Sequence, residues 1–182
     1  MDKKEPKKLV RGAFGSVLPF LNVRPLLLPT YLNFIQNMVG SSAFRHSFAV
    51  VNGKKKDMLE DGRVSCAFFA SSVMRVFGLA NDIHATVPGT LRDMEQAGWQ
   101  KISKPKPGAI LVWASKSDEN DAVIHHTHIG FYAGDKKAVS NNPKGDKAKD
   151  RVIIKHHWTF GVNGGKPKRK VEAIYWHPKL DS

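Results

Sequence analysis

The chain has 182 residues, of which 41% are hydrophobic, 9% aromatic and 25% charged, a composition that fits one soluble globular domain and excludes disorder throughout. A single cysteine, Cys66, excludes a disulfide framework. Lysine and arginine number 29 against 16 acids, and the formal net charge of +13 favours anionic partners such as nucleic acid, a cell-wall polymer or a membrane surface.

The N-terminal part of the sequence predicts neither a membrane span nor a signal peptide. The longest uncharged run, residues 25–44, contains two prolines and several polar residues, whereas a spanning helix needs about 20 mainly apolar residues. Arg11 and Arg24 interrupt the apolar stretch that follows the charged residues 1–8, and no clear cleavage site comes after it. We therefore expect no transmembrane segment, and a protein that works in the cytoplasm or is exported by another route.

Hydrophobic periodicity and turn residues predict helices first and strands afterwards. Helices are expected over 30–40, 66–77 and 90–97, and strands over 47–52, 109–113, 128–133, 137–140, 151–155 and 170–176. Thr30, Ser65 and Thr90 are the expected N-caps, and Asp93 completes a capping box with Thr90. Helices followed by strands joined in hairpins predict an α+β fold with an antiparallel sheet.

The same pattern predicts one domain without internal repeats. Residues 1–8 are expected to form a disordered basic tail, and residues 9–182 the domain, with an N-terminal helical extension over about 9–60. Residues 54–56, three lysines, are expected in the turn after the first strand. Residues 161–170 are rich in glycine and lysine and predict a loop.

Cys66 stands where a helix is expected to begin. Unpaired N–H groups and the helix dipole at that end stabilise a thiolate and lower the pKa of the thiol, so Cys66 is a candidate nucleophile. Free cysteine is also among the most buried residue types, and a packing role in the core is the alternative. The position of the residue leaves both interpretations open.

Three histidines crowd into residues 125–128, and His128 opens a predicted strand. A thiol nucleophile needs a base, which usually comes from a distant part of the sequence, and a ring at a strand start can project toward the helix. Cys66, His126 and His128 could also bind zinc, but a structural zinc site needs four ligands and there is no second cysteine. We therefore favour a cysteine–histidine pair with no cofactor.

Three segments, SCAFFASSVMRVFG, KPKPGAILVW and HTHIGFYAGDKKAVSN, resemble the NlpC-type cysteine peptidases, which are papain-like enzymes of bacterial cell-wall turnover. In that family a cysteine starts a helix, a strand follows a Pro-Gly turn, and a later strand opens with the histidine of an H-[VI]-G-[IF]-Y-x-G motif. The resemblance covers about residues 60–142. It implies a papain-like fold, Cys66 as nucleophile, His128 as general base, and a peptide or peptidoglycan-like amide as substrate.

The sequence departs from the family pattern around the nucleophile and at the third polar residue. Ser65 and Ala67 flank Cys66 where the family usually has Asp and Ser. The family's third polar residue, typically histidine, lies twelve residues after the base, and that position here is Ser140. Asn141 and Asn142 are alternatives for orienting the imidazole, and we expect Ser140 because the spacing needs no gap.

The predicted function is therefore hydrolysis of an amide bond by acyl transfer through Cys66. Two alternatives remain: a non-catalytic basic binding module of the same fold, and a nucleic-acid-binding protein. Acid-free stretches over 96–117 and 151–171 carry many lysines and arginines together with Trp99, Trp113 and Trp158. Basic residues interleaved with aromatic ones can bind single-stranded nucleic acid, although lysines also solvate ordinary loops.

Overall fold

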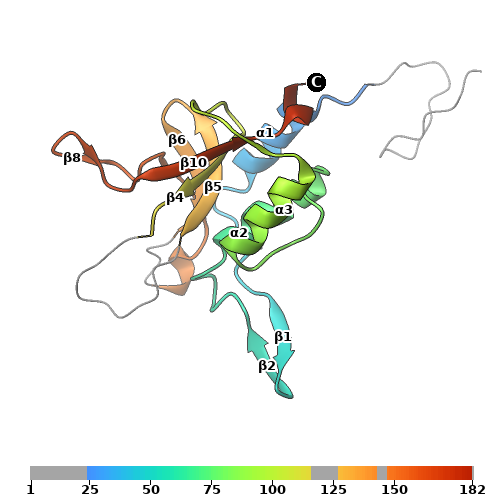
Figure 1. The fold of residues 1–182 in the computed structure, drawn as a ribbon. Coiled ribbons are helices and arrows are strands. Elements are labelled where there is room, and N and C mark those ends of the chain that lie inside the picture. Colours follow the sequence, from blue (N-terminus) through green and yellow to red (C-terminus); the bar gives the residue numbers. More distant parts are fainter. Residues whose placement is uncertain (1–23, 116–126, 143–146, 182) are drawn as a thin grey trace, which may run out of the picture.

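The computed structural model describes residues 24–115, 127–142 and 147–181 (Figure 1). The helices are α1 (Leu27–Asn37), α2 (Cys66–Val76) and α3 (Val87–Ala97), with 3-10 turns η1 (Ala148–Asp150) and η2 (Pro178–Asp181). The strands are β1 (Phe48–Val51), β2 (Lys54–Asp57), β3 (Gln100–Lys101), β4 (Ile110–Trp113), β5 (His128–Gly134), β6 (Lys137–Asn141), β7 (Ile153–His157), β8 (Val162–Asn163), β9 (Lys166–Pro167) and β10 (Val171–Trp176). Mixed helices and antiparallel strands confirm the α+β prediction.

One six-stranded antiparallel sheet, in the order β3-β10-β4-β5-β6-β7, forms the centre of the molecule. Successive side chains of a strand point to opposite faces. Ile129 and Phe131 of β5 belong to the larger apolar cluster together with α2, whereas Trp113 belongs to a smaller cluster on the other face. Because His128 lies directly opposite Trp113 in the register, both share that second face.

Helix α2 packs against β5 and β6 on one face of the sheet, and α3 lies beside α2 (Figure 1). Most of α2 is buried, because its sequence is apolar nearly all round, and Phe69 meets Phe131 of β5 edge to face with ring centroids 5.3 Å apart. Helix α1 contributes Tyr31, whose buried hydroxyl donates to the Gly108 carbonyl at 3.2 Å. This packing sets the start of α2 against the start of β5.

Two of the expected helix starts are wrong by several residues. Helix α1 begins three residues before Thr30, and the Thr30 hydroxyl donates to the Leu26 carbonyl at 2.7 Å. Helix α3 is capped by Thr86, whose hydroxyl accepts the Gly89 N–H at 3.2 Å, while Thr90 lies inside the helix. In α3 the sequence offers two threonines, and Pro88 in the first turn favours the earlier one as the cap. In α1 the first turn likewise contains a proline, Pro29, and Thr30 follows it inside the helix.

The N-terminal extension, expected to be helical, contains α1 and also the β1–β2 hairpin. Asn52 and Gly53, both with positive φ, make the tight turn, so the three lysines expected there form β2 instead. Residues 161–170, expected as a loop, hold the short β8–β9 hairpin. Within the described ranges no helix is long and apolar enough to cross a bilayer. Residues 1–8 lie outside those ranges, and the assignment of one domain stays a prediction.

Candidate active site

Cys66 is the first residue of α2, as expected, and its side chain is 8% exposed. Burial raises the pKa of the thiol, while hydrogen bonds from the backbone N–H groups of Ile129 and Ala67 and the charge of Arg169 lower it; the net shift is upward. This differs from the lowered pKa that a helix start predicts. The physical reason is desolvation, which disfavours the anion more than the helix terminus favours it.

The helix start is not capped by a side chain. Ser65 occupies the N-cap position, but its hydroxyl donates to the Gly62 carbonyl at 3.0 Å, so the orphan N–H groups of the first turn receive no bond from it. The buried Asn141 side chain donates to the same Gly62 carbonyl at 3.2 Å and thereby joins β6 to the loop before Cys66. Its Oδ1 atom is buried without a hydrogen-bond partner among the described residues.

His128 is the first residue of β5 and is 4% exposed. Its ring packs against Trp113 and Phe160, with centroids 5.3 and 5.7 Å away. The next residue, Ile129, gives its N–H to the Cys66 sulfur, so the thiol meets β5 one residue from the imidazole. Cys66 and His128 thus lie at the same end of β5. The His128 ring, however, lies with Trp113 on the sheet face opposite the α2 cluster, and no hydrogen bond joins it to the Cys66 sulfur within the described residues.

Ser140 of β6 binds the imidazole: its Oγ lies 2.9 Å from His128 Nε2. Gly130 makes this approach possible. A Cβ atom there would lie 2.6 Å from the Val139 carbonyl oxygen and 2.8 Å from Ser140 Cβ, distances that no side chain tolerates. The alternative orienting residues bond elsewhere in the structure, Asn141 to Gly62 and Asn142 to the Asp150 carbonyl at 2.9 Å.

His156 extends this chain, which the sequence analysis did not anticipate. Its Nε2 lies 2.9 Å from Ser140 Oγ, and its Nδ1 lies 2.8 Å from the carbonyl oxygen of His157. A carbonyl only accepts, so Nδ1 of His156 carries a proton. Burial lowers the pKa of His156, so the ring is neutral and its Nε2 accepts the Ser140 hydroxyl proton.

The tautomer of His128 follows from this chain. Ser140 also has the Asn141 carbonyl as an acceptor at 3.1 Å, but donating there would require a doubly protonated His156. With its proton directed to His156, the Ser140 oxygen accepts from Nε2–H of His128. Burial, then the charges of Arg169 and His156, hold the pKa of His128 well below its ordinary value, so the ring is neutral and its Nδ1 bears a lone pair.

Arg169 is the one cation buried beside these groups within the described residues, and it is 8% exposed. Its Nε donates to the Ala114 carbonyl at 2.9 Å, and its guanidinium carbon lies 5.5 Å from the Phe160 ring centroid. The positive charge lowers the pKa values of both Cys66 and His128. It therefore favours a thiolate and disfavours an imidazolium. In the sequence Arg169 is one of many basic residues of 151–171, and nothing distinguishes it.

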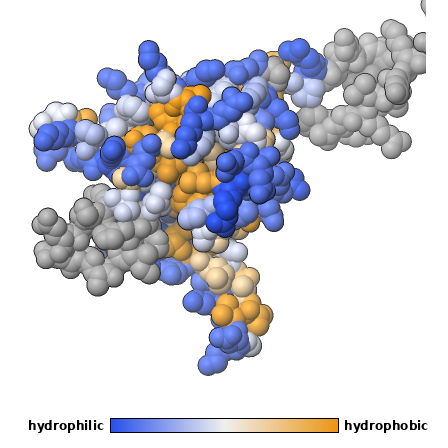
Figure 2. All heavy atoms as spheres, viewed as in Figure 1, coloured by the Kyte–Doolittle hydropathy of each residue, from blue (hydrophilic) through white to orange (hydrophobic). Residues whose placement is uncertain are grey.

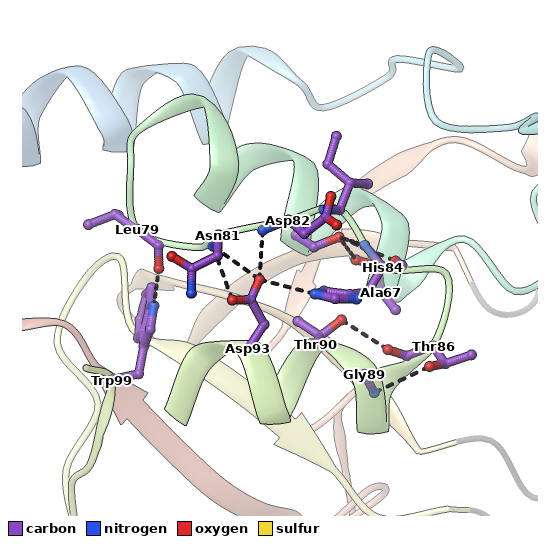
Figure 3. A network of polar contacts seen from close by, with 12 residues as sticks. Ala67, Leu79, Asn81, Asp82, His84, Thr86, Gly89, Thr90, Asp93 and Trp99 are labelled. Carbon is purple, nitrogen blue, oxygen red and sulfur yellow. Dashed lines mark hydrogen bonds and ion pairs between the residues drawn. The ribbon is translucent and has the colours of Figure 1, made fainter. Parts of the chain in front are cut away.

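A second polar network, centred on Asp93, supports α2 from the side of α3 (Figure 3). The Asp93 carboxylate accepts the N–H groups of Asn81 and Asp82 and lies 3.0 Å from His84 Nε2. Burial raises the pKa of Asp93, but these hydrogen bonds outweigh it and the pKa lies below its ordinary value. The capping-box role expected for Asp93 is therefore wrong: the carboxylate binds the loop between α2 and α3.

The Asp93 network reaches the first turn of α2 through Ser71. The Ser71 hydroxyl donates to the Ala67 carbonyl at 2.7 Å and accepts the His84 N–H at 2.9 Å. Trp99 closes the other end of the loop by donating its indole N–H to the Leu79 carbonyl at 2.6 Å (Figure 3). Cys66 thus starts a helix whose first turn is tied to a buried carboxylate.

The alternative of a zinc site gains no support in the part of the chain that the structure describes. No group of three histidine, cysteine or acidic side chains there is placed to bind a metal ion. His126, one of its three expected ligands, lies outside the described ranges. No protein-family model matches the chain, and a search of curated proteins finds no match either.

Proposed function

We propose that the protein is a cysteine hydrolase that cleaves an amide bond, with Cys66 as nucleophile, His128 as general base and Ser140 as the residue that orients His128. The observation that carries the proposal is the chain His128–Ser140–His156, because it fixes the tautomer in which Nδ1 of His128 is free to take a proton. A cysteine that only packs in the core needs no histidine held in one tautomer at the same end of β5.

The fold belongs to the same proposal. A buried helix that begins with Cys66 and packs on an antiparallel sheet, one strand of which begins with His128, resembles the papain-like arrangement of the NlpC-type peptidases and supports the proposal. Ser140 occupies the position of their third polar residue. His156, from the neighbouring strand, supplies an imidazole behind the serine, where the family usually has a histidine in direct contact with the base.

The resting pair in this mechanism is a neutral thiol and a neutral imidazole, because burial raises the pKa of Cys66 and lowers that of His128. As the sulfur attacks the amide carbon, Nδ1 of His128 takes the thiol proton. The carbonyl oxygen becomes an oxyanion, which the backbone N–H of Cys66 at the start of α2 can bind. The imidazolium then gives its proton to the amide nitrogen, the C–N bond breaks, and an acyl thioester remains on Cys66.

Water completes the cycle. His128 takes a proton from water, the resulting hydroxide attacks the thioester carbon, and the C–S bond breaks. The acid product leaves, and the proton on His128 returns to the Cys66 sulfur. Arg169 favours the thiolate as leaving group, since its charge lowers the pKa of the thiol.

The substrate class is tested by digesting peptidoglycan fragments and following the gain of one water molecule by mass spectrometry. We expect cleavage by the wild-type chain, none by Cys66→Ala, and a loss of about 10²- to 10⁴-fold for His128→Ala, the usual contribution of a general base. His46→Ala, at an exposed histidine two residues before β1, is the control and should cleave normally. Equal cleavage by the wild type and Cys66→Ala would exclude Cys66 as the nucleophile, and no cleavage by any chain would favour the non-catalytic binding module.

A further inference from the structure

The β1–β2 hairpin projects from the body of the molecule and forms a two-stranded sheet of its own (Figure 1). Its first strand presents large apolar side chains to solvent: Phe48 is 58% exposed and Val50 is 76% exposed. Its second strand begins with three exposed lysines, residues 54–56. Figure 2 shows hydrophobic and hydrophilic residues adjacent on this projection. An isolated hairpin in water is marginally stable, so this exposure needs an explanation in terms of function.

The base of the hairpin is firmly held, so its exposure is part of the fold. The Asp57 carboxylate accepts the backbone N–H groups of Ser47, Leu59 and Asp61, and lies 2.8 Å from His46 Nδ1. Leu59 is fully buried just beyond the second strand. These bonds fix both ends of the hairpin at the same place.

Asp61 connects this base to the rest of the protein. Its carboxylate binds the Arg45 Nε and lies 2.7 Å from Nη1 of Arg151, which precedes β7 of the large sheet. The hairpin is thus anchored at one end, with its Asn52-Gly53 turn at the far end. A rigid projection of this kind keeps its apolar side chains available to a partner.

The chemistry of the hairpin matches the interface of an anionic lipid bilayer. Valine and phenylalanine side chains gain free energy on leaving water, and lysines bury their methylene groups while the ammonium stays at the phosphate level. Across the hairpin, Lys55 pairs with Val50 and Lys54 with Val51, so each exposed valine has a cation directly opposite. Asp57, the hairpin's acid, is bound at the base.

A protein strand and a nucleic acid fit this surface less well. Three successive lysines on an edge strand are a feature that discourages pairing with a further strand. Single-stranded nucleic acid needs open aromatic faces for stacking, but the Phe48 ring is already stacked with His46, at 5.6 Å, and lies 4.2 Å from Lys55 Nζ. The two valines offer apolar area without a stacking surface.

We infer that the β1–β2 hairpin docks the protein on an anionic lipid bilayer, inserting Phe48 and Val50 from one of its faces and Val51, next to the turn, from the other, while Lys54, Lys55 and Lys56 bind lipid phosphates. This inference does not depend on the proposed hydrolase activity. Flotation with two kinds of vesicle, pure phosphatidylcholine and phosphatidylcholine mixed with phosphatidylglycerol, tests it. The wild-type chain should partition onto the mixed vesicles and much more weakly onto the neutral ones.

Three variants, each checked for folding by circular dichroism, separate the hairpin from general charge. Lys54→Gln with Lys55→Gln and Lys56→Gln should weaken partitioning by about a hundredfold, since each lysine near an anionic bilayer contributes about fivefold. Val50→Thr with Val51→Thr keeps β-branched side chains and should weaken it several-fold. The control removes three exposed lysines from the other hairpin region, as Lys166→Gln, Lys168→Gln and Lys170→Gln, and should weaken it far less.

Two results would overturn the inference. Equal losses from the two triple variants would mean that overall positive charge, and not the hairpin, drives binding. Failure of the wild type to float with the mixed vesicles would also overturn it. If the wild type then retained an RNA oligonucleotide that the hairpin triple variant lost, the surface would be assigned to nucleic acid.

Discussion

The molecule has two buried polar networks that both contain histidine, but only the network around Asp93 is centred on a charged group. Asp93 is a carboxylate that accepts two backbone N–H groups and lies beside His84. Ser140 is a neutral hydroxyl between two histidines. A buried carboxylate that accepts several hydrogen bonds fixes the position of its donors. A neutral hydroxyl between two neutral rings can orient an imidazole without the negative charge that would stabilise its protonated form. The first network suits support of α2, and the second suits a general base.

The largest effect on stability is expected from Asp93→Asn. An amide cannot replace a carboxylate that accepts from three partners, and hydrogen bonds to a charged group stabilise by about 1.5–3 kcal/mol, so we expect a loss of about 2–3 kcal/mol in the free energy of unfolding. Urea unfolding followed by circular dichroism measures this loss near neutral pH.

The pH dependence of that loss sharpens the test. The folded pKa of Asp93 is depressed, so its contribution is present above the unfolded pKa of about 3.9 and disappears as the pH falls through the folded value. The difference between wild type and Asp93→Asn should therefore be constant at neutral pH and shrink in acid. A difference that grows in acid would mean that the carboxylate is not the stabilising form.

Ser140→Ala is expected to affect activity more than stability. Without the hydroxyl, His128 Nε2 loses its acceptor and the ring can turn, and misplacement of a catalytic group by about 1 Å can cost about 100-fold. We expect the rate of Cys66 acylation to fall by about 10- to 100-fold. Ser103→Ala, at an exposed loop position, should acylate normally. An unchanged rate in Ser140→Ala would show that the hydroxyl does not orient His128.

The smallest expected effect comes from His156, which acts through Ser140. His156→Ala removes the acceptor of the serine proton and should slow acylation several-fold, whereas the side-chain oxygen of His156→Gln can accept that proton and should restore most of the rate.

The pH profile of the same two variants gives a second readout. In acid, where His156 becomes protonated, its charge lowers the pKa of His128. Removing the imidazole should therefore raise that pKa and move the acidic limb of the rate profile to higher pH in both variants. Rate loss without any displacement of the limb would indicate a purely structural role for His156.

The parts of this site that the sequence predicts are those with a local signal. The apolar block after Ser65 and the left-handed Gly78 define α2, and the HIGFYAG run defines β5, so Cys66 and His128 could be placed at element starts. The spacing of the resembling family, twelve residues after the base, predicts Ser140 as the residue that orients His128. The thiol pKa could not be predicted, because burial of Cys66 depends on how α2 packs on the sheet.

The remaining residues depend on long-range pairing. His156 lies one residue beyond the predicted end of its strand, and its contact with Ser140 arises from the register of β6 with β7. Arg169 lies after the short β8–β9 hairpin, whose two-residue strands have no periodicity to detect. The spacing of Thr90 and Asp93 predicts a capping box, but Thr86 competes for the N-cap role and caps the helix.

The most direct test of the account is acylation of Cys66 by p-nitrophenyl acetate, followed by intact-protein mass spectrometry near neutral pH. The account predicts one acetyl group on Cys66 in the wild-type chain, formed at least about tenfold more slowly in His128→Ala, because the neutral thiol needs a base as it attacks. Equal acylation rates in the two chains, or acetyl groups found only on lysines, would contradict it.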